Sequence, residues 1–318
     1  MRRLVAFAVA LLLLALPAAC TGRTQAVGTP AIDSSVGESA PGTTGSTTSS
    51  ELPGGSSEHR LNSGGISRSY RVYRPQGLSG AVPLVLFLHG GFGTAAQAEA
   101  KYGWDSQADA GRFVVAYPDG IDRAWNAGGG CCGQPAAKGI DDVGFISAVV
   151  RDIRQQADID PDRIYLTGMS NGGIMTYTMA CRTDLFAAIG PVAATVLDSC
   201  RSPAPVSVIA VHGTADTQVR YQGGVGEGPA HIDGPAVPTV NGTWRSVDGC
   251  TPPQVRTVGP VTTSVADCPG DRSVELITVE GAGHQWPGSS VTREGADPPS
   301  TALNATAVIW QFFAAHHR

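Results

Sequence analysis

The chain has 318 residues, of which 42% are hydrophobic, so it is long enough and apolar enough for one large folded domain. Its formal net charge is −5, and Lys and Arg form no cluster within the part expected to fold. Because phosphate backbones are bound by concentrated basic surface, this charge argues against a nucleic-acid partner.

Residues 1–19 have the pattern of a secretory signal. Two arginines precede an apolar core at 4–16, and small residues stand directly before Cys20. The apolar run is too short to span a bilayer. Small residues before a cysteine are similar to the bacterial lipobox, so we expect either that Cys20 is acylated or that the chain is cleaved and released. Both outcomes place the protein outside the cytoplasm.

Residues 20–65 are predicted to form a flexible tether. Ser, Thr, Gly and Pro dominate this stretch, and it has too few large apolar side chains to offset the entropy of ordering. If Cys20 carries a lipid, the tether would hold the folded domain clear of the membrane, which the protein would contact only through that lipid. The catalytic domain is therefore expected to cover residues 66–318.

Apolar runs that suit strands recur through the expected domain. An alternating stretch at 69–73 suits an edge strand, whereas the later runs suit strands buried on both faces. These later runs are 82–88, 113–117, 164–167, 187–192, 206–211 and 274–279.

Helical patterns lie between and after these runs. One begins at an N-cap of Asp141 or Asp142, one covers 172–181, and the last begins at Ser300 or Thr301. Buried strands that alternate with helices indicate an α/β fold, a mostly parallel sheet flanked by helices. In such sheets the active site lies at the carboxyl ends of the strands.

The motif around which the chain is organised is Gly168-Met169-Ser170-Asn171-Gly172, a G-x-S-x-G sequence. In this motif a strand turns sharply into a helix, and the glycines remove Cβ atoms that would collide in the turn. Pro161 and Asp162 are expected to form a turn before the strand. Because strand, elbow and helix follow in the required order, we interpret Ser170 as a nucleophile rather than a chance match.

A serine hydroxyl needs a general base within hydrogen-bond reach. His284 follows the last predicted strand in a glycine-rich loop, so we expect it to be the base. His89 and His212 each stand before a glycine directly after a buried strand, where a histidine commonly orders the loop.

The base in turn needs an acid that orients it. Asp216 also follows a buried strand and is the expected acid, with Asp233 and Asp248 as fallbacks in less ordered surroundings. The order Ser170, Asp216, His284 is that of the α/β-hydrolases and differs from that of chymotrypsin-like and subtilisin-like proteases.

An oxyanion hole is expected at the glycine loop that follows the strand at 82–88. The backbone N–H groups of Gly91 and Asn171 would bind the oxyanion, with that of Phe92 as the alternative donor. Phe92 is also a candidate contact for the substrate. Taken as structure alone, the same stretch would be only a glycine turn.

Six cysteines remain in the expected domain, and an even number in an exported chain favours disulfides. We expect Cys250 to pair with Cys268. The two adjacent cysteines would each reach a different partner, chosen from the next two in the chain. No paired C-x-x-C or H-x-x-x-H spacing occurs, so a metal site is not expected. The six are Cys131, Cys132, Cys181, Cys200, Cys250 and Cys268.

Several motifs occur in order: His89-Gly90-Gly91, Tyr117-Pro118-Asp119-Gly120, Trp125-Asn126 followed by Cys131-Cys132-Gly133, Asp141-Asp142-Val143-Gly144-Phe145, the elbow, and Gly283-His284-Gln285-Trp286-Pro287. Together they resemble the exported polyhydroxybutyrate depolymerase/feruloyl esterase family over about 67–313. The resemblance implies the α/β-hydrolase fold, no cofactor, and a triad of Ser170, Asp216 and His284. It also implies that Trp286 and Trp125 line the acyl or aromatic pocket.

We therefore predict a serine esterase that acts through an acyl-enzyme on a small ester or oligoester, as a monomer. A peptidase of the prolyl-oligopeptidase type shares the triad order, but no propeller-sized domain precedes the elbow. A non-catalytic envelope lipoprotein on a hydrolase scaffold is the second alternative, and it would have no need to keep a triad together.

Overall fold

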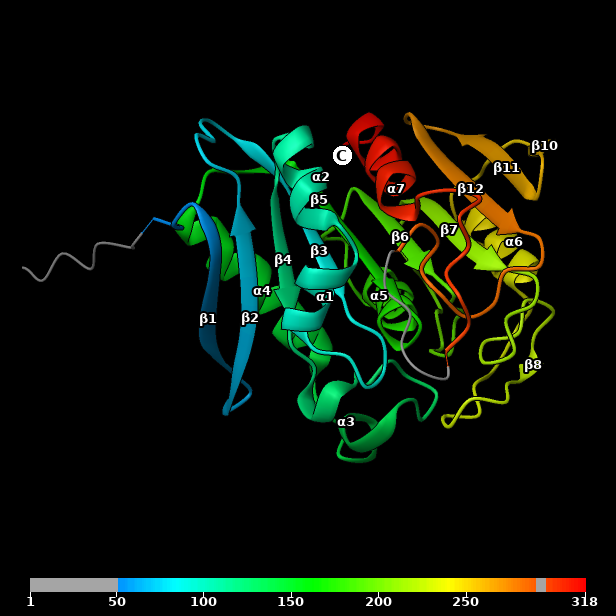
Figure 1. Ribbon diagram of the computed structural model, residues 1–318, viewed down its shortest axis with the longest axis horizontal. Coiled ribbons are helices and arrows are strands. Elements are labelled where there is room, and N and C mark those ends of the chain that lie inside the picture. The colour runs from blue at the N-terminus through cyan, green and yellow to red at the C-terminus, as the bar shows by residue number, and fades with distance from the viewer. Residues whose placement is uncertain (1–50, 290–295) are drawn as a thin grey trace, which may run out of the picture. The chain divides into compact units, whose positions relative to one another are not determined.

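The computed structural model describes residues 51–289 and 296–318. The predicted signal, Cys20 and the first part of the predicted tether lie outside the described residues. Within this part of the chain, a ten-stranded sheet has the order β1-β2-β4-β3-β5-β6-β7-β12-β11-β10 (Figure 1). None of the described helices is both long enough and apolar enough to cross a membrane.

The six central strands run parallel to one another. Antiparallel strands extend the sheet at both edges. The predicted mostly parallel α/β sheet is thus confirmed, and each predicted buried run lies within a central strand or within one residue of it. The central strands are β4 (Val114–Pro118), β3 (Val82–Leu88), β5 (Ile159–Met169), β6 (Ala188–Val192), β7 (Ser207–Gly213) and β12 (Arg272–Val279).

The edges of the sheet are less apolar. β2 (Ile66–Arg74) and the edge strand β1 (Gly55–Ser63) extend the sheet on one side, and β11 (Val261–Cys268) and the edge strand β10 (Gln254–Val258) extend it on the other. β8 (Gly224–Val225) pairs with β9 (Asp233–Gly234) in a separate ladder.

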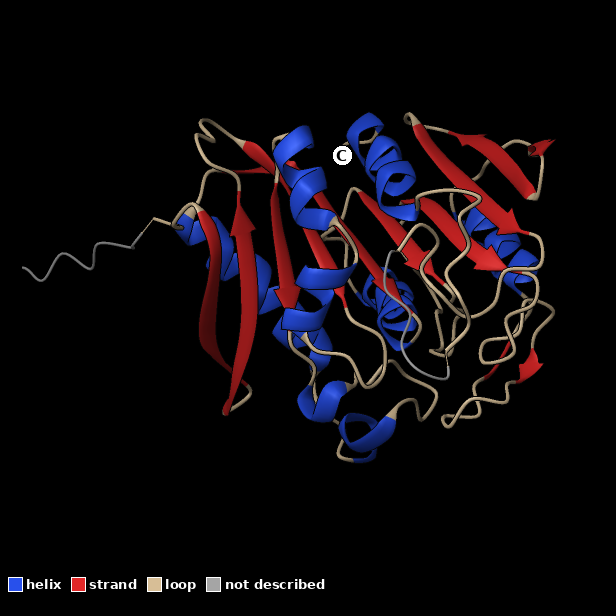
Figure 2. Cartoon of the chain, in the orientation of Figure 1, coloured by secondary structure: helices blue, strands red, loops and turns tan. Residues whose placement is uncertain are grey.

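Helices cover both faces of the sheet (Figure 2). Alternate side chains of β3 point to opposite faces, so its apolar run contributes to two cores. One core contains α1 (Ala95–Lys101), α2 (Trp104–Gly111) and α7 (Ala305–Ala315). The other contains α4 (Asp142–Gln156), α5 (Asn171–Arg182) and α6 (Val237–Val247). A one-turn helix, α3 (Gly133–Ala137), and a 3-10 turn at Ile121–Arg123 lie in the loop after β4.

The predicted helix starts are confirmed at α4 and wrong at α7. The Asp141 side chain caps α4 by accepting from the Gly144 N–H. The last helix is capped by Asn304, whose side chain accepts from the Ala307 N–H, three or four residues after the predicted start. Asn is as favourable at the N-cap as Ser or Thr, so several residues before this helix could have capped it.

The predicted tether is wrong over its last residues, because β1 lies inside it. β1 pairs with β2 along its whole length, and its side chains alternate between partly buried and exposed. The strand is polar, and its hydrogen bonds are supplied by β2, so composition alone does not reveal it. β2 is consequently not an edge strand, and the ordered domain begins before residue 66.

The predicted turn at Pro161 and Asp162 is also wrong, since both residues lie inside β5. The register against β3 shifts there, between the pairs Val82–Ile159 and Leu84–Ile164. A proline is tolerated at such an irregularity because the ladder is interrupted there.

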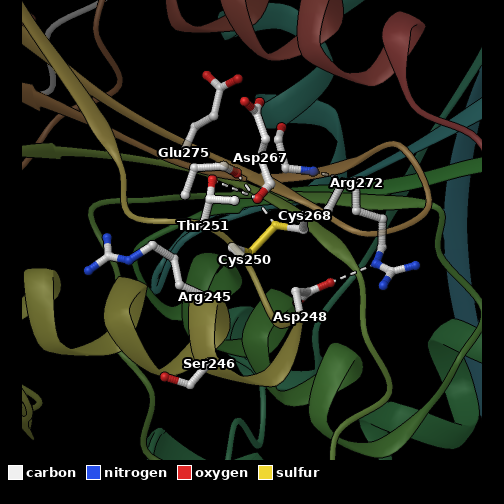
Figure 3. The surroundings of a disulfide bond; sticks show 12 residues. Arg245, Ser246, Asp248, Cys250, Thr251, Asp267, Cys268, Arg272 and Glu275 are labelled. Carbon is white, nitrogen blue, oxygen red and sulfur yellow. Dashed lines mark hydrogen bonds and ion pairs between the residues drawn. A yellow bond between two sulfur atoms is a disulfide. The ribbon is translucent and has the colours of Figure 1, made fainter.

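Three disulfides occur in the described residues, and one of them was predicted. Cys250–Cys268 ties the turn after α6 to the end of β11, beside the ion pair of Arg272 with Asp248 (Figure 3). The expected partners of the adjacent cysteines are wrong. Cys131 is bonded to Cys132, which leaves the cysteine at the end of α5 to pair with the one after β6 as Cys181–Cys200.

Candidate active site

Ser170 stands on a sharp turn between β5 and α5. Its φ of 56° lies in the left-handed region, which is unusual for a residue with a side chain. A Cβ on Gly168 would lie 2.6 Å from the carbonyl oxygen of Gly172, so the turn closes only with glycine there. The Ser170 N–H donates to the carbonyl of Val192 at 2.9 Å, which fixes the tip to the neighbouring strand.

His284 joins Ser170 to Asp216 in one chain of hydrogen bonds. Its Nε2 lies 2.8 Å from the Ser170 hydroxyl oxygen, and its Nδ1 lies 2.8 Å from Oδ2 of Asp216. The loops after β12 and β7 carry the histidine and the aspartate, and these strands are neighbours in the sheet. With the ring hydrogen on Nδ1, Nε2 is free to accept the serine proton.

Asp216 is surrounded by donors. Its Oδ1 accepts the N–H groups of Gln218 at 2.9 Å and Val219 at 2.8 Å. Burial alone would raise its pKa, but hydrogen bonds and attraction from His212 and His284 hold that pKa well below its usual range. Asp216 therefore stays ionised beside the imidazole.

His212 is a second histidine on the same carboxylate. Its Nε2 lies 3.2 Å from Oδ2 of Asp216 and 2.8 Å from the carbonyl oxygen of Val219. Both neighbours are acceptors, so Nε2 carries the hydrogen. The sequence pattern assigned His212 to loop ordering, and it missed the contact with the aspartate.

The fallback acids lie elsewhere. Asp233 is exposed in β9, and the Asp248 carboxylate accepts from Nε of Arg272 at 2.8 Å. Of the three aspartates, the structure brings Asp216 to His284.

Asp297 holds the backbone of the histidine loop. Its Oδ2 accepts the His284 N–H at 2.6 Å, and a Cβ on Gly283 would overlap this carboxylate. Asp297 comes from a proline-rich stretch 13 residues further on, without a motif around it. No sequence pattern therefore points to Asp297.

Gly91 and Asn171 lie side by side next to Ser170. A Cβ on Gly91 would be 3.9 Å from the Cβ of Asn171. Neither backbone N–H donates to an acceptor among the described residues. Phe92, the alternative donor, does not fit the role, because its N–H donates to the carbonyl of Arg123 at 2.8 Å. Both amides therefore lack a backbone acceptor among the described residues and lie close to the nucleophile, which makes them candidate donors to an oxyanion.

His89 orders the glycine loop, as its position predicted. Its Nδ1 lies 2.8 Å from the Gly90 carbonyl, and its Nε2 accepts the Gly120 N–H at 2.9 Å. Burial lowers the pKa of His89, although the bond to Gly90 partly opposes this. The ring is therefore neutral and links the glycine loop to the turn after β4.

The two tryptophans expected in the pocket are buried elsewhere, which corrects that expectation. Trp286 is 1% exposed and donates from Nε1 to Thr306, and Trp125 is 0% exposed and donates from Nε1 to the carbonyl of His89. Each indole N–H is already hydrogen-bonded inside the core, so both rings pack beneath the loops of the site and do not line the cavity.

A cavity of about 170 Å³ opens onto Ser170 and His284. The ring of Phe92 is 57% exposed and lines it, in keeping with the expected substrate contact. Its other lining side chains include Lys101, Arg123 and the amides of Gln97, Gln218 and Gln285. Among residues 51–289 and 296–318, no group of three or more His, Cys, Asp or Glu side chains is placed to hold a metal ion.

Comparison with known sequences identifies relatives of this chain. The family model described as esterase PHB depolymerase matches residues 68–223. The NocK protein of Nocardia uniformis subsp. tsuyamanensis is 32% identical over 257 residues, which cover 71% of this chain and 72% of NocK. Feruloyl esterase B of Piromyces equi is 30% identical over 236 residues. That match covers 68% of this chain and 42% of the esterase, so the chain spans less than half of its length.

Comparison with solved structures supports the fold. The acetyl xylan esterase from Aspergillus awamori superposes with a TM-score of 0.58 at 16% identity. The match covers 81% of this chain and 99% of that enzyme.

Proposed function

This chain belongs to the PHB depolymerase family of esterases, and from that premise we propose that it hydrolyses carboxylic esters through an acyl-enzyme on Ser170. The observation that carries the proposal is the unbroken relay from the Ser170 hydroxyl through His284 to Asp216, with both links at 2.8 Å. A nucleophile, a base and a group that orients the base are the parts that acyl transfer needs.

In the first half of the reaction, His284 takes the hydroxyl proton while the Ser170 oxygen attacks the ester carbonyl. The oxyanion of the tetrahedral intermediate is bound by the N–H groups of Gly91 and Asn171. His284 then gives the proton to the leaving alcohol, and the acyl group remains on Ser170. The ionised Asp216 stabilises the imidazolium that exists between the two proton transfers.

In the second half, water replaces the alcohol. His284 removes a proton from water as it attacks the acyl carbon, and the same two amides bind the second oxyanion. Collapse of this intermediate returns the proton to Ser170 and releases the acid. In both halves the groups that move protons or bind the oxyanion are side chains and backbone amides of this chain.

We place this activity outside the cytoplasm. The three disulfides support this location, because such bonds persist in oxidising compartments. A signal at residues 1–19, a lipid on Cys20 and a monomeric state complete the proposal, with the membrane contacted only through that lipid. These N-terminal features lie outside the described residues.

Steady-state assays on the purified protein test the proposal. We expect hydrolysis of p-nitrophenyl acetate or methyl ferulate, and none of prolyl or aminoacyl p-nitroanilides. A burst of p-nitrophenol equal to the enzyme concentration would report an accumulating acyl-enzyme. Cleavage of the amides with no cleavage of the esters would contradict an esterase and favour a peptidase.

A further inference from the structure

We propose that the active-site cavity selects esters that carry a free carboxylate, which Arg123 and Lys101 bind. This inference rests on the proposed esterase function and names its substrate class. The class comprises monoesters of dicarboxylic acids and esters whose alcohol part bears a carboxylate.

The charge of the cavity is opposite to that of the chain. The chain has 27 acidic and 22 basic residues, yet within residues 51–289 and 296–318 the cavity is lined by Lys101 and Arg123 and by no Asp or Glu. Asp216 is 4% exposed and lies behind His284 without lining the space. A concave site lined by one sign of charge focuses the field and attracts the opposite charge.

No described carboxylate forms an ion pair with Lys101 or Arg123. Asp119, which precedes this turn, accepts the Ala95 N–H at 3.0 Å. Two unpaired cations in a shared cavity are therefore available to an anionic group of the substrate.

Arg123 is fixed at the cavity by its own backbone. Its carbonyl accepts the Phe92 N–H at 2.8 Å, and its guanidinium donates to the Phe92 carbonyl. Asp122 and Arg123 have φ values of 48° and 62°, a left-handed conformation that is unusual for residues with a side chain. The guanidinium has five N–H donors, so one bond to Phe92 leaves an edge that matches a carboxylate.

Arg123 is also anchored one residue away from Gly91, so it has a second possible role as a general stabiliser of the oxyanion. The two roles differ in what they do to an uncharged ester. Oxyanion stabilisation accelerates every ester equally, whereas recognition of a carboxylate accelerates only esters that carry one. The test therefore compares matched charged and uncharged substrates.

Two substrate pairs place the carboxylate on either side of the ester bond. The first pair is mono-p-nitrophenyl succinate and p-nitrophenyl butyrate, with the charge on the acyl part. The second is 4-carboxyphenyl acetate and 4-(methoxycarbonyl)phenyl acetate, with the charge on the leaving group. The quantity measured is the ratio of kcat/KM for the charged ester to that for the uncharged ester.

The variants are Arg123→Gln, Lys101→Gln and the double variant. In at least one substrate pair, we expect each single substitution to lower the ratio about tenfold. A tenfold change corresponds to the loss of one hydrogen bond between charged groups. Raising the salt concentration should lower the wild-type ratio as well.

Lys138→Gln is the matched control, since Lys138 is the other lysine of the chain and is exposed outside the cavity. It should leave the ratio unchanged.

A lowered ratio in the Arg123 and Lys101 variants, with an unchanged ratio in Lys138→Gln, supports the inference. Equal ratios in the wild type and the double variant for both pairs overturn it, and so does an Arg123 variant that loses both members of a pair equally. If no ester is hydrolysed and Ser170 fails to react with a fluorophosphonate, the esterase function itself is wrong and this inference falls with it.

Discussion

The loop after β3 and the loop after β12 are built alike and do different things. Both are rich in glycine, both lie at the carboxyl ends of parallel strands, and both place one buried histidine at the cavity that opens onto Ser170. The ring of His89 binds backbone groups of Gly90 and Gly120. The ring of His284 binds the side chains of Ser170 and Asp216. The chemistry of each histidine is therefore set by the groups that its ring contacts.

Charge separates the two histidines further. His89 has a lowered pKa and is held neutral between a carbonyl and an N–H. His284 has an ionised carboxylate at 2.8 Å, which stabilises the cation that forms when it takes a proton. Only the second arrangement suits a residue that must gain and lose a proton in each turnover.

The largest expected effect is that of His284→Ala. Without the base, Ser170 is an ordinary hydroxyl, and kcat on p-nitrophenyl acetate should fall about 10⁴–10⁶-fold. Circular dichroism and thermal unfolding serve as controls for folding. A folded variant that keeps more than a hundredth of the wild-type kcat would show that another group is the base.

His212 tests whether the second histidine positions the aspartate. His212→Gln keeps an N–H donor for Asp216, whereas His212→Leu cannot donate. We expect the leucine variant to have a kcat about tenfold below that of the glutamine variant, with similar KM, because a buried carboxylate loses one donor. Equal kcat values for the two variants would make His212 a packing residue only.

Asp297 is the next test, with a smaller expected effect. Asp297→Asn keeps an oxygen that accepts the His284 N–H, while Asp297→Ala removes it. We expect the alanine variant to lose about tenfold in kcat and the asparagine variant to remain close to wild type, since a misplaced base slows proton transfer. A loss in both variants would point to the charge of Asp297 rather than to its hydrogen bond.

His89 should affect stability more than turnover. The folded protein holds this ring neutral, and its pKa is lower than in the unfolded chain, where it is near 6.5. The unfolded state therefore binds more protons below that pH, and the stabilisation present above pH 6.5 is lost as the pH falls. The free energy of unfolding of the wild type should fall by up to about 1.4 kcal/mol per pH unit more steeply than that of His89→Gln.

Urea unfolding between pH 7.5 and 5.5 measures these slopes, with a substitution of an exposed histidine, His231→Gln, as control. Parallel slopes for wild type and His89→Gln would contradict the neutral assignment.

The parts of the site that follow directly from local sequence were predicted. The G-x-S-x-G elbow is encoded by glycines a few residues apart, and the buried strands by continuous apolar runs. Placing Asp216 and His284 needed only the rule that parallel strands bring their carboxyl ends to one edge. The structure puts both beside Ser170.

The parts that depend on contacts distant in sequence were missed. β1 is polar and exists because β2 pairs with it. Asp297 reaches His284 from a stretch without a motif. Trp125 and Trp286 look the same in sequence whether they line a pocket or fill a core, and here both are in the core. Cysteine spacing allowed several pairings and did not distinguish among them.

The central claim is that His284 activates Ser170, and covalent labelling measures it most directly. The folded protein is treated with a fluorophosphonate, and intact mass and peptide mapping locate the adduct. We expect one adduct per chain, on Ser170, none in Ser170→Ala, and a strongly slowed reaction in His284→Ala. An unmodified Ser170 in the folded wild-type protein would contradict the claim.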